Sequence, residues 1–227
     1  MSNSLHNAVQ QGNPLLFKSL FEENPRLVNA KDDDSRTPLI WAMSTGQDEI
    51  ASIILKAAKQ GAIKDFEIDE QDNAGWSALH VASSKGDLEM VRQLIENGAD
   101  VNLKTNNGVT PVHLAVSHDD ADVVKYLIDH NGSVRTKDNL DRTALQRAAA
   151  AGFEDIISVL IAAKAPVSAT DSYGWTALHH ACAEGHAEIA VQLIKAGASL
   201  DDVDKEDHTP FDVGTEPVKK ALKGYKH

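Results

Sequence analysis

The sequence predicts an all-α fold, a solenoid of about seven helix-turn-helix repeats with β-turn fingers. One phrase recurs along the chain with a Thr or Ser at its third position: SRTPLIWA (35–42), GWSALHVA (75–82), GVTPVHLA (108–115), DRTALQRA (141–148), GWTALHHA (174–181) and DHTPFDVG (207–214). These anchors fall at 37, 77, 110, 143, 176 and 209, so the last four intervals are 33 residues and the first is 40. A fixed period of this length is typical of stacked repeats.

Each unit begins with a turn and a first helix. In DNAGWS (72–77) and DSYGWT (171–176), Asp and Gly frame a tight turn in which Gly supplies the positive φ. The Thr or Ser then occupies the N-cap, and Pro38, Pro111 and Pro210 fill the first helical position. Glycine in SSKGD (83–87), AAAGF (149–153) and AEGHA (183–187) predicts the end of the first helix.

A second helix follows in each unit. In DLEMVRQLIENGAD (87–100), the spacing of Leu88, Val91, Leu94 and Ile95 predicts one buried face, and Asn97-Gly98 ends the helix. The interval of 40 places about seven extra residues within 56–71, which predicts a lengthened connection. The last unit breaks the pattern and ends in a short basic helix, which we interpret as a cap.

The period of 33 with a T-P-L-H-x-A core resembles the ankyrin repeat, so the chain is identified as an ankyrin-repeat solenoid. A partial copy, SLHNAV, begins at Ser4. We expect a single domain over 1–227 without an internal linker. Its repeats are expected at approximately 1–33, 34–73, 74–106, 107–139, 140–172, 173–205 and 206–227, the last being the C-terminal cap.

Composition narrows the class of protein. The 227 residues carry a net charge of -12, which disfavours nucleic acid as a partner because phosphate binding needs a basic surface. No apolar run is long enough for a membrane span, and the polar start lacks the features of a signal peptide, so we expect a cytoplasmic and nuclear protein without a membrane partner. The single Cys182 excludes an internal disulfide and a Cys-rich zinc site. We expect a monomer without cofactor.

Comparing the repeats with one another distinguishes residues that maintain the fold from residues that could bind a partner. Leu39, Leu79, Val112, Leu145, Leu178 and Phe211 share one apolar position, which indicates packing. The histidines His6, His80, His113 and His179 also share one position, which favours a hydrogen-bonding brace over metal or catalysis, since zinc needs three or four converging ligands. Cys182 lies beside two histidines, but its position in the other repeats is small and apolar, and no oxyanion site accompanies it.

The residue before each anchor varies among the repeats and is tryptophan twice, at 76 and 175. Tryptophan and arginine dominate binding hot spots, so we expect these side chains to bind a partner, although packing of Trp76 on a neighbouring finger is the alternative. The full set of expected partner-binding residues is Asp34, Arg36, Trp41, Asn73, Trp76, Val109, His118, Arg142, Arg147, Trp175 and His180. We expect no catalytic and no metal-binding residues.

Three segments, DDDSRTPLIWAMSTG (32–46), DNAGWSALHVASSKGDLEMV (72–91) and KDNLDRTALQRAAAAG (137–152), resemble the gankyrin family. The resemblance implies a non-enzymatic assembly chaperone of the 26S proteasome regulatory particle. Such a protein binds the C-terminal domain of one AAA ATPase subunit through a concave surface of fingers and first helices. It also implies that Asp34 faces partner arginines, that Arg36 faces partner carboxylates and that Trp76 supplies contact area.

The sequence departs from that family at two places. His118 stands where the family has a basic residue, which weakens one expected ion pair or makes it dependent on pH. In HACAE (180–184), His180 replaces the leucine of a Leu-x-Cys-x-Glu motif, so the activity attached to that motif is not expected. The alternative function is an ankyrin-repeat adaptor or inhibitor of a kinase or transcription factor, because the same scaffold serves many functions. An enzyme is a more distant third.

Overall fold

The computed structural model describes residues 5–225 and divides the chain into two compact units, Met1–Asn106 and Asn107–His227. The division falls where the sequence places the boundary between the third and fourth repeats. Ser4, at which the partial first copy begins, lies outside the described residues. The single-domain organisation of the whole chain therefore stays a prediction.

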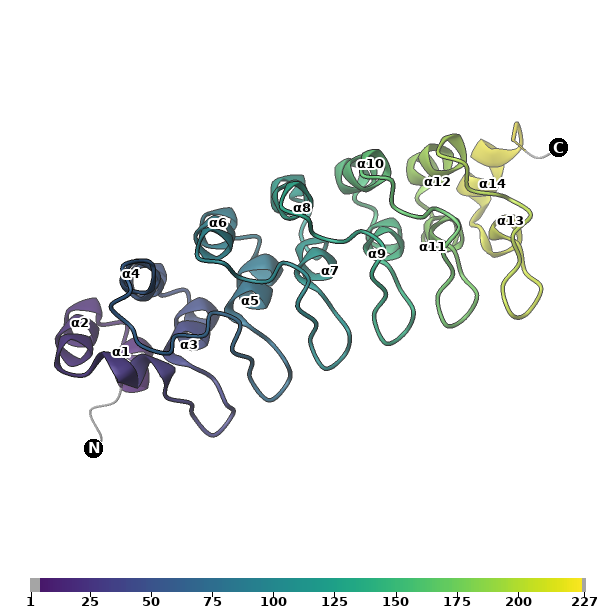
Figure 1. The fold of residues 1–227 in the computed structure, drawn as a ribbon. Coiled ribbons are helices and arrows are strands. Elements are labelled where there is room, and N and C mark those ends of the chain that lie inside the picture. The colour runs from purple at the N-terminus through teal and green to yellow at the C-terminus, as the bar shows by residue number, and fades with distance from the viewer. Residues whose placement is uncertain (1–4, 226–227) are drawn as a thin grey trace. The chain divides into compact units, whose positions relative to one another are not determined.

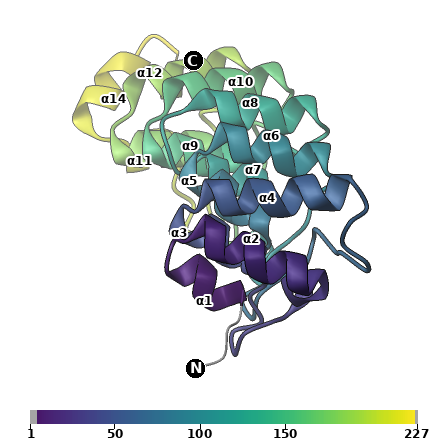
Figure 2. The same ribbon diagram turned by 90° about the vertical axis from the view of Figure 1, so that its left-hand side faces the viewer.

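The first unit contains three helix pairs and one short 3₁₀ helix. Its elements are α1 (Leu5–Gln10), α2 (Pro14–Glu23), η1 (Pro25–Asn29), α3 (Pro38–Thr45), α4 (Asp48–Lys59), α5 (Ala78–Lys85) and α6 (Leu88–Glu96). The first helices of the repeats, α1, α3 and α5, pack on one another, and the second helices α2, α4 and α6 form a parallel layer (Figure 2). Each helix pair thus buries its apolar face against the next pair.

The second unit repeats this arrangement with α7 (Pro111–Ala115), α8 (Ala121–Asp129), α9 (Ala144–Ala151), α10 (Glu154–Ala162), α11 (Ala177–Glu184), α12 (Ala187–Lys195), α13 (Pro210–Val213) and α14 (Glu216–Leu222). In both units the fingers project beyond the first helices (Figure 1). Residues 5–225 form no strand, and the prediction of about seven helix-turn-helix repeats with finger turns is confirmed. No helix in this range is long and apolar enough to cross a membrane.

The predicted caps are where the sequence places them. Thr37, Ser77, Thr110, Thr143, Thr176 and Thr209 are the N-caps of α3, α5, α7, α9, α11 and α13. Gly46, Gly86, Gly152 and Gly185 end four of these helices in the left-handed conformation. The apolar position of the repeat is buried from Leu39 to Leu178, while Phe211 in the last repeat is half-buried.

Two local predictions need correction. The extra residues of the second repeat do not all form a connection, because α4 has 12 residues where α6 has 9. The rest of the insertion is anchored, since Ile63 is buried and Asn29 Nδ2 donates to the carbonyls of Lys64 and Asp65 at 3.1 and 3.2 Å. In α6 the buried face consists of Met90, Val91 and Leu94, whereas Leu88 and Ile95 are only half-buried.

The first helix of the fourth repeat departs from the pattern of the other repeats. Helix α7 ends at Ala115 and has 5 residues, where α5 has 8. Asp119 occupies the position that is glycine in five other repeats, at Gly12, Gly46, Gly86, Gly152 and Gly185, and it has a negative φ. Aspartate adopts the left-handed conformation less readily than glycine, and at Asp119 it does not adopt it, so the usual glycine ending of the first helix is absent here.

The recurring histidines brace neighbouring turns, as predicted. His80 Nδ1 accepts from the backbone N–H of Ser77 at 3.1 Å, and its Nε2 lies 3.0 Å from the carbonyl of Leu103 in the next finger. His113 and His179 repeat this pattern, and His6 Nε2 contacts the carbonyl of Arg36 at 2.8 Å. Among residues 5–225, no group of three His, Cys, Asp or Glu is arranged to hold a metal ion.

Candidate functional site

Five of the six finger turns are each built on one aspartate, and the finger of the fourth repeat has Thr105 in its place. In the third repeat, Oδ1 of Asp72 accepts the backbone N–H groups of Ala74 and Trp76 at 2.9 and 2.8 Å, while the Gly75 N–H donates to the Asp72 carbonyl at 2.9 Å. Asp32, Asp138, Asp171 and Asp204 do the same in their repeats. Because Oδ1 holds the turn, Oδ2 is the atom left to interact with side chains.

Two positions supply donors to that Oδ2: the residue before the N-cap and the fourth residue of the first helix. On Asp32, Arg36 Nη2 lies at 3.0 Å and Trp41 Nε1 at 2.6 Å. On Asp138, the guanidinium groups of Arg142 and Arg147 lie at 3.1 and 2.6 Å. On Asp171, His180 Nε2 lies at 2.9 Å. Five predicted site residues are thus hydrogen-bonded to their own fingers: Arg36, Trp41, Arg142, Arg147 and His180.

The third repeat lacks both donors. Trp76 and Val81 occupy the two positions, and within the described part of the chain no side chain donates to Oδ2 of Asp72. Trp76 is half-buried beside the His80 ring, with 6.3 Å between ring centroids, and its indole N–H finds no acceptor in residues 5–225. The third finger therefore presents an unpaired carboxylate oxygen and an unpaired indole donor.

The indole N–H of the other finger tryptophan has a hydrogen-bond acceptor within the protein. Trp175 Nε1 donates to Oδ2 of Asp204 in the next finger at 2.9 Å. The residue equivalent to Asp204 in the finger after Trp76 is Thr105, which offers no carboxylate. The indole N–H of Trp175 is thus bound by the next finger, whereas that of Trp76 is not.

Asp34 and Arg36 pair with each other. Arg36 Nη2 lies 2.8 Å from Oδ2 of Asp34, and its guanidinium carbon lies 4.2 Å from the centre of the Trp41 ring. The carboxylate side chain of Asp34 is 64% exposed, so the ion pair is screened by water and a partner can displace it for less than about 1 kcal/mol. The roles expected of the two residues toward a partner stay predictions.

Asn73 bridges two fingers. Its backbone N–H donates to the carbonyl of Asp34 at 2.9 Å, its Nδ2 donates to the carbonyl of Asp33 at 3.2 Å, and Ser35 Oγ donates to its Oδ1 at 2.8 Å. Asn73 is exposed, but its side chain already stabilises the neighbouring turn. A role in partner binding would come in addition to this structural one.

In the second unit, Val109, Arg142 and Arg147 line one pocket of about 380 Å³ together with Asp138 and Leu140. Burial alone would raise the pKa of Asp138, but hydrogen bonds from Arg147 and Arg142 outweigh burial and lower that pKa below its ordinary value. One carboxylate faces two guanidinium groups, so the pocket has a surplus of positive charge. His118 is exposed in the connection between α7 and α8 and does not line this pocket.

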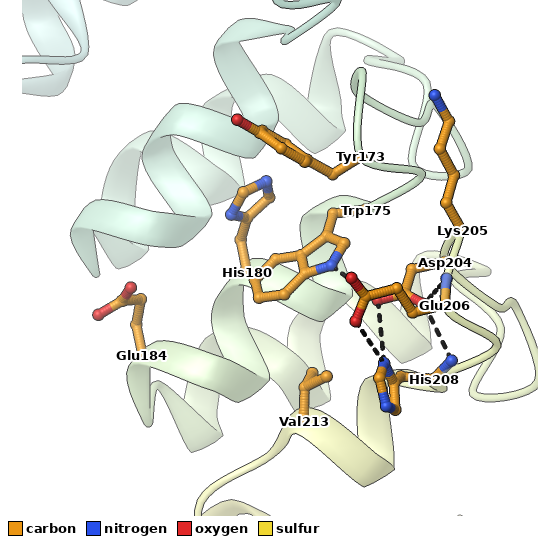
Figure 3. A pocket seen from close by; sticks show the side chains of 9 residues that line it. All are labelled: Tyr173, Trp175, His180, Glu184, Asp204, Lys205, Glu206, His208 and Val213. Carbon is orange, nitrogen blue, oxygen red and sulfur yellow. Dashed lines mark hydrogen bonds and ion pairs between the residues drawn. The ribbon is translucent and has the colours of Figure 1, made fainter.

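Trp175 and His180 line a second pocket, of about 780 Å³ (Figure 3). Sequence reasoning did not single out three of its other lining residues, Tyr173, Glu184 and Glu206. The sequence did carry one signal, because DSYGWT places two aromatic side chains on a single turn. Cys182 is fully buried in the same helix as His180, and burial raises the pKa of its thiol to about 12, so it is not an activated nucleophile.

Comparison with known proteins decides the family. A family model described as ankyrin repeats in three copies matches residues 5–105, 58–138 and 113–207. The chain belongs to the ankyrin-repeat family. Among solved structures, the ankyrin repeat domain of Bcl-3 superposes with a TM-score of 0.80 over 97% of each chain at 24% identity, which shows the shared ankyrin fold.

Two relatives of this ankyrin-repeat protein carry proteasome names. "Probable 26S proteasome regulatory subunit p28" of Saccharomyces cerevisiae is 38% identical over 97 residues, which are 42% of this chain and 41% of the relative. "26S proteasome non-ATPase regulatory subunit 10" of Dictyostelium discoideum is 36% identical over 92 residues, which are 40% of this chain and 37% of the relative.

A further relative has a different name. "Ankyrin repeat and SAM domain-containing protein 6" of Rattus norvegicus is 34% identical over 101 residues, which are 44% of this chain and 11% of the relative. In all three cases the matched stretch spans less than half of the relative's length. The ankyrin family and a protein-binding role are thus supported, and the partner is a separate question.

Proposed function

We propose that this ankyrin-repeat protein is a non-enzymatic assembly chaperone that binds the C-terminal domain of a regulatory-particle AAA ATPase subunit of the 26S proteasome. The observation that carries the proposal is the similarity to two proteins named as 26S proteasome regulatory subunits, at 38% and 36% identity. The resemblance of the finger segments 32–46, 72–91 and 137–152 to the gankyrin family agrees with it.

The finger chemistry supports a protein partner with charges of both signs. Asp34 offers a displaceable carboxylate, and the pocket around Arg142 and Arg147 offers positive charge. Charged side chains at an interface act mainly on the association rate and on partner choice. Trp76 is the side chain with free hydrogen-bonding capacity and a large apolar surface, so we expect it to contribute more of the binding free energy.

Titration calorimetry of the purified chain with purified C-terminal domains of the regulatory-particle ATPase subunits tests this proposal. We expect one of these domains to bind. We expect Trp76→Ala to weaken that binding by at least about 1 to 2 kcal/mol, because the indole offers a large apolar surface and an N–H donor that has no acceptor within residues 5–225. That loss corresponds to roughly a 5- to 30-fold higher Kd.

The matched control replaces charges on the second helices, Glu49→Ala together with Arg92→Ala, which are exposed and lie outside the fingers. This control should bind like the unmodified chain. An unchanged Kd for Trp76→Ala would remove the indole from the contact. If none of the ATPase domains binds, the proteasomal function is rejected and an adaptor for other proteins takes its place.

A further inference from the structure

The pocket at the sixth and seventh fingers combines aromatic rings with uncompensated acidic side chains. Tyr173 and Trp175 come from the sixth finger, His180 and Glu184 from α11, Glu206 from the seventh finger and Val213 from α13. Its volume of about 780 Å³ lies within the range of pockets that hold a ligand. All of these residues belong to the second unit.

Trp175 is a rigid platform in this pocket. Its indole N–H is held by Asp204 at 2.9 Å, the ring of His180 meets it edge-on with 5.1 Å between centroids, and the ring of His179 stacks at 6.0 Å. Tyr173 beside it is 65% exposed, although the finger backbone is fixed by the bond from Lys205 N–H to the Tyr173 carbonyl at 3.2 Å. Aromatic surface fixed in this way binds a ligand at little cost in conformational entropy.

The charges at the rim favour a cation. Glu184 and Glu206 are exposed and lie on either side of Trp175 in the view of Figure 3. Glu184 has no ion pair within the described residues, and Glu206 has only a long contact of 3.8 Å to His208 Nδ1. Asp204 is already used by Trp175 and by two backbone N–H groups. The amine of Lys205, the one lysine or arginine that lines the pocket, points away from Trp175.

We propose that this pocket binds an arginine side chain of a partner protein, with the guanidinium group over the Trp175 ring and its N–H groups directed to Glu206 and Glu184. An indole face attracts cations, and arginine is favoured over lysine because its planar group stacks on the ring, is less strongly hydrated and can donate to two carboxylates. This site adds to the finger surface and does not depend on the partner being an ATPase subunit.

Nuclear magnetic resonance titration of the ¹⁵N-labelled full chain with short blocked peptides tests the proposal. The peptides are identical except for a central arginine, lysine or citrulline, and citrulline keeps the shape of arginine without its charge. We expect the arginine peptide to shift the Trp175 indole N–H signal saturably in the millimolar range. We expect at least about 10-fold weaker binding of the citrulline peptide and several-fold weaker binding of the lysine peptide.

Variants locate the site. Glu184→Gln and Glu206→Gln should each weaken the arginine peptide at least about 3-fold, since each removes a rim carboxylate. Both residues are exposed, so the rest of the spectrum should be unchanged. The control Glu188→Gln neutralises an exposed carboxylate on α12 and should leave the binding of the arginine peptide unchanged. The proposal is overturned if the arginine peptide causes no saturable shift, if citrulline binds equally well, or if neither Gln variant weakens binding.

This experiment is separable from the test of the proteasomal function. It uses no ATPase domain, and the residues it changes belong to the second unit, whereas Trp76 belongs to the first. If no ATPase domain binds but the arginine peptide does, the protein binds arginine side chains of a different partner. The opposite result would keep the chaperone proposal and remove this pocket from it.

Discussion

In most repeats one side chain, usually histidine, joins the N-cap of the first helix to the next finger. In the fourth repeat, His113 Nδ1 accepts the Thr110 N–H at 3.2 Å, and its Nε2–H donates to the carbonyl of Arg142 at 3.2 Å. Adding a proton to Nδ1 would break the bond to the N-cap. Burial, followed by the charge of Arg147, lowers the pKa of His113 to about 4. Burial also lowers the pKa of His179.

In the fifth repeat a glutamine, which does not take up a proton, replaces the histidine. Gln146 occupies the same position, accepts the Thr143 N–H at 2.7 Å and donates to the carbonyls of Ala169 and Trp175. The unfolded chain protonates a histidine near pH 6.5, whereas folded His113 stays neutral down to about pH 4. Its contribution to stability is therefore complete above about pH 6.5 and is lost as the pH falls toward 4, by up to about 3 kcal/mol.

We predict that His113→Gln makes the chain less sensitive to acid. Between about pH 7.5 and pH 5, urea denaturation should show a loss of unfolding free energy that is smaller for the variant than for the unmodified chain by about 2 kcal/mol. The reverse replacement, Gln146→His, should increase the loss over the same interval. Equal pH dependence of all three proteins would show that this position does not control acid stability.

At the scale of the element, the fingers are joined in a ladder of backbone hydrogen bonds. Within the first unit, Asn73 N–H donates to Asp34 and Asn106 N–H donates to Ala74, and within the second unit Asn139, Ser172 and Lys205 donate to the preceding fingers. The fourth residue of every finger has a positive φ, but only three of the six are glycine. At Gly75 an added Cβ would lie 2.5 Å from the backbone N of Asn106.

We predict opposite effects of two substitutions at this finger position. Gly75→Ala should lower the free energy of unfolding by at least about 1 to 2 kcal/mol, because the left-handed conformation and the contact with Asn106 both disfavour a side chain. Asp141→Gly, at φ 58, should be neutral or stabilising by up to about 1 kcal/mol. Denaturant unfolding measures both, and a neutral Gly75→Ala would contradict the role assigned to the ladder.

Most helices could be predicted from the sequence because their ends depend on capping residues that are close along the chain. Thr37 and Gly46 mark the two ends of α3 whatever surrounds them. Helix α7 is short where Asp119 replaces the glycine that ends the first helix in other repeats. A search for matching motifs does not notice a residue that is missing. The internal pairing of Asp34 with Arg36 requires the folded turn, since the sequence shows only that two opposite charges are close along the chain.

The two finger tryptophans differ in hydrogen bonding because of a residue in the next finger. Trp76 and Trp175 occupy the same position of near-identical phrases, GWSALH and GWTALH. The residue 29 positions later decides whether the indole has an acceptor, and it is Thr105 in one case and Asp204 in the other. The sequence therefore predicts a variable finger position, while the three-dimensional contact decides which indole is still available to a partner.

At the scale of the whole molecule, the two units present different chemistry on their fingers. The first unit offers Asp34 and the unpaired Trp76, and the second offers the arginine pair on Asp138 and the aromatic pocket around Trp175. A protein partner that uses both units must therefore carry basic and acidic groups. This distribution is the physical basis of the proposed recognition of one ATPase domain among many proteins of similar charge.

Affinity capture from cell lysate, with mass spectrometry of the bound proteins, tests this central claim most directly. The unmodified chain is compared with the triple variant Asp34→Ala, Arg36→Ala, Trp76→Ala, and with the control Glu49→Ala, Arg92→Ala, after circular dichroism has shown that all three are folded. We predict that regulatory-particle ATPase subunits bind the unmodified chain and the control and are lost from the triple variant. Capture of other proteins without any ATPase subunit, or undiminished capture by the triple variant, would contradict the account.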